Sequence, residues 1–139
     1  MDLTLTIIEA GILMTLSGIH FSWVFGGKFG FDVAIPTNPK GEKVLNPKAM
    51  DSFIVASGLL IFALYFLIRQ GLIAINLPAS IDKYGGWVIS TIFLFRAIGD
   101  FKYVGFFHKV RGTRFSNMDL KLFSPLCLLL SLIGYYLIW

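Results

Sequence analysis

The stretch Trp87–Phe107, WVISTIFLFRAIGDFKYVGFF, decides the fold class. It is apolar and about as long as the roughly 20 residues that a helix needs to cross a bilayer, yet it contains Arg96 and Asp100. An unpaired charge in hydrocarbon costs a few kcal/mol or more. Positions three and four apart share one face of a helix, which puts Gly99 and Tyr103 beside the two charges. We therefore predict a polar stripe within the membrane, and we expect the other helices to supply hydrogen-bond partners for its side chains.

The composition of the whole chain supports the same class. Of its 139 residues, 56% are hydrophobic and 14% are charged, whereas soluble domains use about 25% charged residues. The mean hydropathy is +0.76. Backbone polar groups in lipid must be satisfied internally, and the apolar runs are too continuous for alternating barrel strands. We expect an all-α integral membrane four-helix bundle with up-down topology.

The apolar runs predict a single transmembrane domain, residues 1–139, with four spans at about 3–25, 52–69, 86–107 and 122–139. The connection Gly26–Met50 contains Pro36, Pro39 and Pro47 and exceeds the usual loop length. A loop of this length favours a lid over a simple tether. We expect it to cover the cytoplasmic mouth of the bundle.

The distribution of basic residues predicts the orientation. The first and third connections carry eight Lys and Arg residues, namely Lys28, Lys40, Lys43, Lys48, Lys109, Arg111, Arg114 and Lys121. The other side carries Arg69 and Lys83. By the positive-inside rule the basic side is cytoplasmic, and both termini face the non-cytoplasmic side.

Counting along each span at 1.5 Å per residue predicts a shared polar layer. One polar residue from each span lies at a depth of roughly 20–25 Å: His20, Ser57, Asp100 and Cys127. We expect Arg96 to pair with Asp100, and His20 to contact Asp100. Ser17 and Tyr103 extend this candidate ligand-binding layer, and Glu9, nearer the outer surface, is a candidate proton site.

The same polar residues have a structural interpretation of about equal weight, because interhelical polar contacts in membranes often serve only to hold helices together. The sequence has a single Cys and no His-x-x-x-His or Glu-x-x-His pattern, so we expect no metal and no cofactor. The basic residues lie between apolar runs, so we expect membrane lipids as partners and no nucleic acid. The oligomeric state stays open.

Several motifs resemble a known family. They are His20-Phe-x-Trp23, Gly26-Gly27, the run Arg96–Phe107, Arg111-Gly-Thr-Arg-Phe115 and Ser124-Pro-Leu-Cys127. Together they resemble the bacterial membrane family known as domain of unknown function 3995, over essentially the whole chain. The resemblance implies a four-helix protein of the bacterial inner membrane and no established activity.

Three functions follow from these observations. The leading hypothesis is a protein that binds or transports a small anionic or amphipathic, lipid-like molecule, with its head held by Arg96. The first alternative is a membrane enzyme on a lipid-soluble substrate, with His20 or Asp100 as general acid or base. The second is a non-catalytic interaction or immunity protein whose polar layer is structural.

Overall fold

The computed structural model describes residues 2–139, and the regular elements within them are helices. Three helical stretches are long and apolar enough to cross a membrane, by length and composition: α1 (Leu3–Val24), α3 (Ala49–Arg69) and the continuous stretch Arg114–Ile138. Asp2 caps α1, because its Oδ1 accepts a hydrogen bond from the Leu5 N–H at 3.1 Å. These helices indicate a membrane protein, as the composition predicts.

A fourth long helix, α4 (Ala79–Ile98), covers a different stretch from the predicted span 86–107. It begins after Pro78 and ends at Gly99, whose φ of 88° is in the left-handed region that favours glycine. Residues 99–113 then form an irregular loop. The loop's many aromatic residues give it the composition of a span, but the glycine ends the helix.

The last helix begins well before the predicted start at residue 122. It consists of α5 (Arg114–Met118), a π-helical turn η1 (Asp119–Phe123) and α6 (Ser124–Ile138). Thr113 caps it, since its Oγ1 accepts a hydrogen bond from the Ser116 N–H at 3.0 Å. This early start brings Asp119 into the helix.

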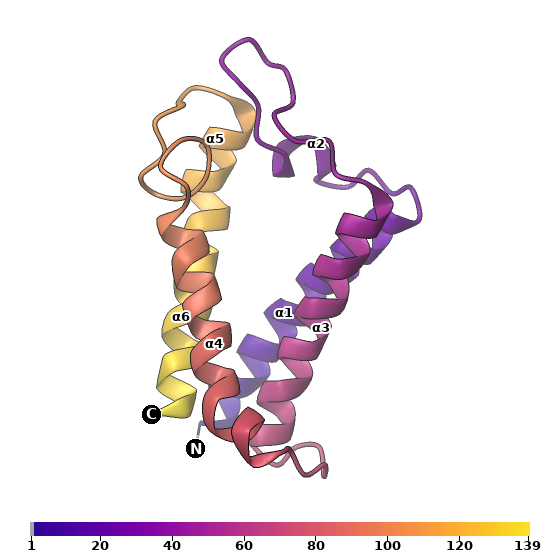
Figure 1. Cartoon of the computed structure of the whole chain (residues 1–139), viewed down its shortest axis with the longest axis vertical. Helices are drawn as coiled ribbons and strands as arrows, with labels where there is room; N and C mark the ends of the chain where they lie inside the picture. The colour runs from indigo at the N-terminus through magenta and orange to yellow at the C-terminus, as the bar shows by residue number, and fades with distance from the viewer. Residues whose placement is uncertain (1) are drawn as a thin grey trace.

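The four long helices form two antiparallel pairs, α1 with α3 and α4 with α6 (Figure 1). The pairs meet near the two chain termini, which we call the terminal end, and diverge toward the opposite end, which we call the loop end. At the loop end the short helix α2 (Phe31–Ala34) packs against α5. The connection that carries α2 therefore joins the two pairs where they are farthest apart.

The core lies where the two pairs meet. Fully buried Leu13, Ala63, Phe66 and Leu130 pack there from α1, α3 and α6. Outside this core, large apolar side chains point outward on every long helix, as with Ile54 at 62% exposed. Helices that are apolar on all sides are typical of membrane spans.

Candidate functional site

Arg96 pairs with Asp119 at the loop end of α4. Its Nη2 donates to Asp119 Oδ1 at 2.8 Å, and the Asp119 side chain is fully buried while that of Arg96 is 33% exposed. The prediction that Arg96 pairs with Asp100 on its own helix is therefore corrected. The helix ends before Asp100, so the i, i+4 geometry that the pair requires does not exist.

Asp119 also holds the loop that follows α4. Its Oδ2 accepts the Gly105 N–H at 2.7 Å and lies 3.5 Å from His108 Nδ1. His108 Nε2 lies 2.8 Å from Ser116 Oγ, and His108 Nδ1 also contacts the Gly105 carbonyl. We call Arg96, Gly105, His108, Ser116 and Asp119 the loop-end cluster.

The contacts of His108 indicate its tautomer. Both groups at Nδ1, the Gly105 carbonyl and the Asp119 carboxylate, are acceptors, so Nδ1 carries a proton and a neutral ring accepts the Ser116 hydroxyl proton at Nε2. The order Asp119–His108–Ser116 has the connectivity of a hydrolase triad. However, Ser116 and His108 are each 1% exposed. Because a substrate has no access to the hydroxyl, the series stabilises the loop.

Two polar groups beside the loop-end cluster have no partner among the described residues. Arg96 Nη1 and Ser124 Oγ are both buried and make no hydrogen bond. Cys127, one turn along α6 from Ser124, is half-buried and lies within electrostatic range of Arg96 and Asp119. A buried donor without an acceptor destabilises the protein, because it loses its hydrogen bonds to water and gains none in their place. This position is therefore suited to an oxygen atom of a bound molecule.

Asp100 is exposed and shapes the turn after α4. Its Oδ1 accepts the backbone N–H groups of Lys102, Tyr103 and Val104 at 2.9, 2.8 and 2.9 Å. Burial is the largest single influence and acts to raise the pKa of Asp100, but the backbone N–H donors of Val104, Lys102 and Tyr103 together outweigh it and hold the pKa of this carboxyl below its usual value.

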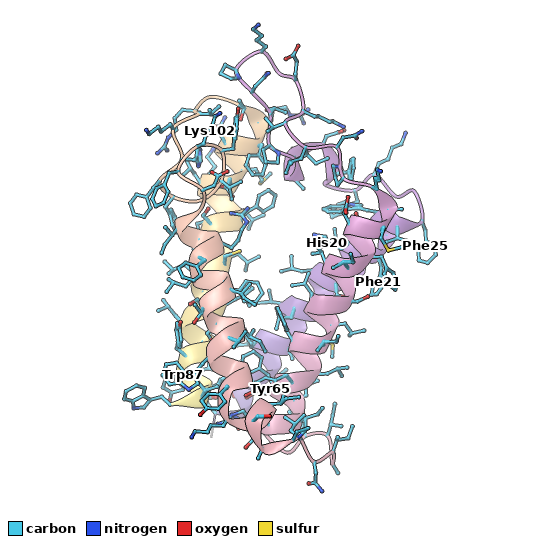
Figure 2. The ribbon with its side chains drawn as sticks, viewed as in Figure 1. His20, Phe21, Phe25, Tyr65, Trp87 and Lys102 are labelled. Atoms are coloured by element: carbon cyan, nitrogen blue, oxygen red, sulfur yellow. The ribbon has the colours of Figure 1, made fainter. Side chains whose placement is uncertain are left out.

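The structure does not bring His20 to Arg96 or Asp100. Figure 2 shows His20 on the α1/α3 pair and Lys102, which follows α4, on the opposite side of the loop end. His20 Nδ1 bonds to the Leu16 carbonyl at 2.8 Å, and its ring lies 4.5 Å from that of Trp23. The predicted contact between His20 and Asp100 is wrong, because the helix pairs diverge at this level.

The remaining predicted site residues lie apart from the cluster. Ser17 is buried and donates to the Ala56 carbonyl at 2.7 Å, which links α1 to α3, and Ser57 lies half-buried on the same pair. Tyr103 is half-buried beneath Lys102, whose Nζ is 5.1 Å from the ring centroid. Glu9 is fully buried, and neither of its carboxylate oxygens has a hydrogen-bond partner in the part of the chain that the structure describes.

The sequence reasoning missed Asp119, His108 and Ser116. From the sequence, all three residues are placed in the connection between the third and fourth predicted spans. The signal that the last helix begins earlier is Thr113. A threonine that caps a helix and precedes apolar residues is a helix-start signal. It moves the start of the last helix to Arg114 and brings Asp119 to the level of Arg96.

Comparison with known proteins identifies one family. The family model described as "Protein of unknown function (DUF3995)" matches residues 13–133. No curated protein and no solved structure matches the chain.

Proposed function

We propose that this chain, which belongs to the DUF3995 family of unknown function, binds an anionic amphipathic molecule beside Arg96. We propose further that it is an integral protein of the bacterial inner membrane. The four long helices would span this membrane, with the loop end in the cytoplasm and both termini on the other side.

The observation that carries the proposal is the free guanidinium nitrogen of Arg96. Nη2 is engaged by Asp119, whereas Nη1 is buried and has no acceptor among the described residues. The Arg96 side chain as a whole is 33% exposed, but Nη1 itself is buried, so a ligand oxygen would reach Nη1 only when neighbouring side chains move aside. A charge-assisted hydrogen bond from Nη1 to a phosphate or carboxylate oxygen would satisfy it.

The charge of the loop end favours an anion. Five exposed basic residues surround the loop-end cluster: Lys102, Lys109, Arg111, Arg114 and Lys121. None of them forms a salt bridge within residues 2–139. Each cation near a membrane surface contributes about 1 kcal/mol toward anionic lipids. The same excess of positive charge supports the cytoplasmic placement of this end.

The arrangement of the helices favours an amphipathic ligand. The α1/α3 and α4/α6 pairs diverge toward the loop end (Figure 1), and the connection that carries α2 joins them there. Apolar chains beside the diverging helices would keep the head group at the level of Arg96. Release of the same molecule at the terminal end would make the protein a transporter.

The enzyme alternative receives less support. Its predicted acid or base residues are separated, since His20 bonds to the Leu16 carbonyl and Asp100 bonds within its own turn. The Asp119–His108–Ser116 series is closed to substrates by burial.

Native mass spectrometry of the protein released from bilayers of equal phosphatidylglycerol and phosphatidylethanolamine tests the proposal. We expect the wild type to retain phosphatidylglycerol preferentially. The double variant Arg96→Met with Asp119→Leu replaces the buried pair by apolar groups, and it should lose the preference. Arg96→Lys keeps the positive charge and lacks the second guanidinium nitrogen, so it should weaken the preference.

The matched control is Arg114→Met, which removes an exposed charge from the same end. It should retain the preference, because Arg114 contributes only to the general field. Equal retention of the two lipids by the wild type, or an unchanged preference in the Arg96 variants, would refute the anion site.

A further inference from the structure

Glu9 is the most unusual buried group outside the loop-end cluster. It lies on the inner face of α1, in the second turn of the helix, near buried Thr6, Ala10 and Leu13, and its side chain is 0% exposed. Both of its oxygens lack a hydrogen-bond partner within residues 2–139. A carboxyl group that is removed from water without a partner is expensive to maintain and therefore needs a function or a compensation.

The register of α1 against α3 gives the level of Glu9. The hydrogen bond from Ser17 to the Ala56 carbonyl fixes the two antiparallel helices. Moving from Ser17 back to Glu9, and the same number of residues forward from Ala56, leads to the turn of α3 that contains buried Ala63 and Phe66. Glu9 therefore lies at the level of the core, where the two helix pairs meet.

Two further buried hydroxyls, one on α4 and one on α6, have no hydrogen-bond partner within residues 2–139. Ser90 on α4 and Ser131 on α6 are each 0% exposed, and neither Oγ has a hydrogen-bond partner. Ser90 and Phe66 both lie against Gly134, where an added Cβ would touch them. Ser90 of α4 therefore lies against α6 beside Phe66 of α3, which belongs to the turn that the helix register places level with Glu9.

Within residues 2–139, no positively charged side chain faces Glu9 from the elements packed against α1. The charged residues of α3 are Asp51 and Arg69 near its two ends, and Arg69 pairs with Asp82 at 3.0 Å. Helix α6 has no charged residue, and the hydroxyl of its Tyr135 bonds to Thr91. The other titratable group nearby, Tyr65 of α3, bonds to the Asp82 carbonyl. A proton is therefore the natural partner of this carboxylate.

Water has access to the terminal end of the molecule, where the helix that carries Glu9 begins. A depression of about 940 Å³ lies there, lined by Asp2, Thr4, Gln70 and Tyr135 among others. The Gln70 Oε1 is buried without a hydrogen-bond partner, so a water molecule would be held there. We propose that Glu9 is a proton-binding site in the core that exchanges its proton with water through this depression. The site is independent of the anion site at Arg96.

Infrared spectroscopy of the protein in lipid tests the proposal, because the C=O stretch of a protonated carboxyl is separate from those of carboxylates and amides. At neutral pH we expect one such band in the wild type, its loss in Glu9→Gln, and a shifted band in Glu9→Asp. Glu42→Gln, which removes an exposed loop carboxylate, should leave the band unchanged. After transfer to D₂O the band should shift within minutes.

Access is tested by narrowing the depression. Thr4→Trp should slow the D₂O shift several-fold, whereas Thr15→Trp, at an exposed position farther along α1, should leave it unchanged. A wild-type spectrum without the band, a band that survives in Glu9→Gln, a band that never shifts in D₂O, or equal rates in the two tryptophan variants would overturn the proposal.

Discussion

Asp119 joins groups that are far apart in the sequence. Its two oxygens contact the Arg96 guanidinium, the Gly105 N–H and the His108 ring, and it is fully buried. A buried carboxylate needs hydrogen-bond donors in place of the water it has lost, and removal of any donor leaves part of that loss uncompensated. At the residue scale, this side chain therefore determines whether the loop after α4 and the last helix stay together.

Asp119→Ala should lower the free energy of unfolding by about 3–5 kcal/mol, because it leaves the Arg96 guanidinium partly buried without its carboxylate. Asp119→Leu combined with Arg96→Met should cost clearly less, since it removes both charges. Thermal unfolding in detergent, followed by circular dichroism, measures the difference. Equal losses in the two variants would show that the pair is not energetically coupled.

Asp100 gives a prediction about pH. Because its pKa is lowered in the folded protein, its charged form stabilises the turn above the unfolded value of about 3.9, and this contribution is lost as the pH falls through the lower folded value. The backbone amide resonances of Lys102 and Tyr103 should titrate with a midpoint below about 3.9. A midpoint at or above that value would contradict the hydrogen bonds described.

At the element scale, the loop after α4 folds back on the helix end. The Phe106 N–H donates to the Ala97 carbonyl at 2.8 Å, and the Asp100 N–H donates to the Val104 carbonyl at 3.2 Å. An added Cβ at Gly99 would collide with the Val104 carbonyl, and Gly99 has a φ of 88°. The glycine is therefore required both by its conformation and by the close approach of the chain.

Gly99→Ala should destabilise the protein by roughly 2 kcal/mol or more, from backbone strain and the collision together. Gly58→Ala is the matched control, because Gly58 lies in α3 with nothing within 4 Å of an added Cβ. There alanine should be neutral or stabilise by up to about 1 kcal/mol. Chemical denaturation measures the free energy of unfolding of each variant. Similar values for the two variants would argue against the folded-back loop.

The bounds of the helices show which parts of the fold could be predicted from the sequence. Continuous apolar runs predicted α1 and α3 closely, since nothing within them breaks a helix. The stretch after Ile98 was wrongly assigned to a helix, because its aromatic content outweighed the stop signal of Gly99 followed by Asp100. Because α4 ends at Ile98, the candidate site contains Asp119 in place of Asp100. Arg96 does pair with a buried carboxylate, but this is Asp119 and not the predicted Asp100, and it comes from a segment whose packing depends on tertiary contacts.

At the scale of the whole molecule, the predicted polar layer required four helices in contact at one depth. Instead the two pairs diverge at the loop end (Figure 1), and polar groups gather in two places, the loop-end cluster and the core around Glu9. Counting residues along helices gives depth but not the angle between helix pairs. Packing of side chains at the terminal end sets that angle, which a single sequence does not display.

The orientation of the molecule gives a prediction at this scale. In a Cys127→Ser background, Lys43→Cys should react with a membrane-impermeant maleimide only after cells are opened, because we propose that the basic loop end faces the cytoplasm. Ile75→Cys, exposed in the connection between α3 and α4, should react in intact cells. Labelling of the first variant in intact cells would reverse the orientation.

The central claim is that Arg96 holds an anionic head group at the loop end. An experimental structure of the wild-type protein in nanodiscs that contain phosphatidylglycerol tests it most directly. We predict density for a phosphate oxygen within about 3 Å of Arg96 Nη1, with acyl chains between the α1/α3 and α4/α6 pairs. Helix pairs closed together at the loop end, with Nη1 bonded to a protein acceptor, would contradict the claim.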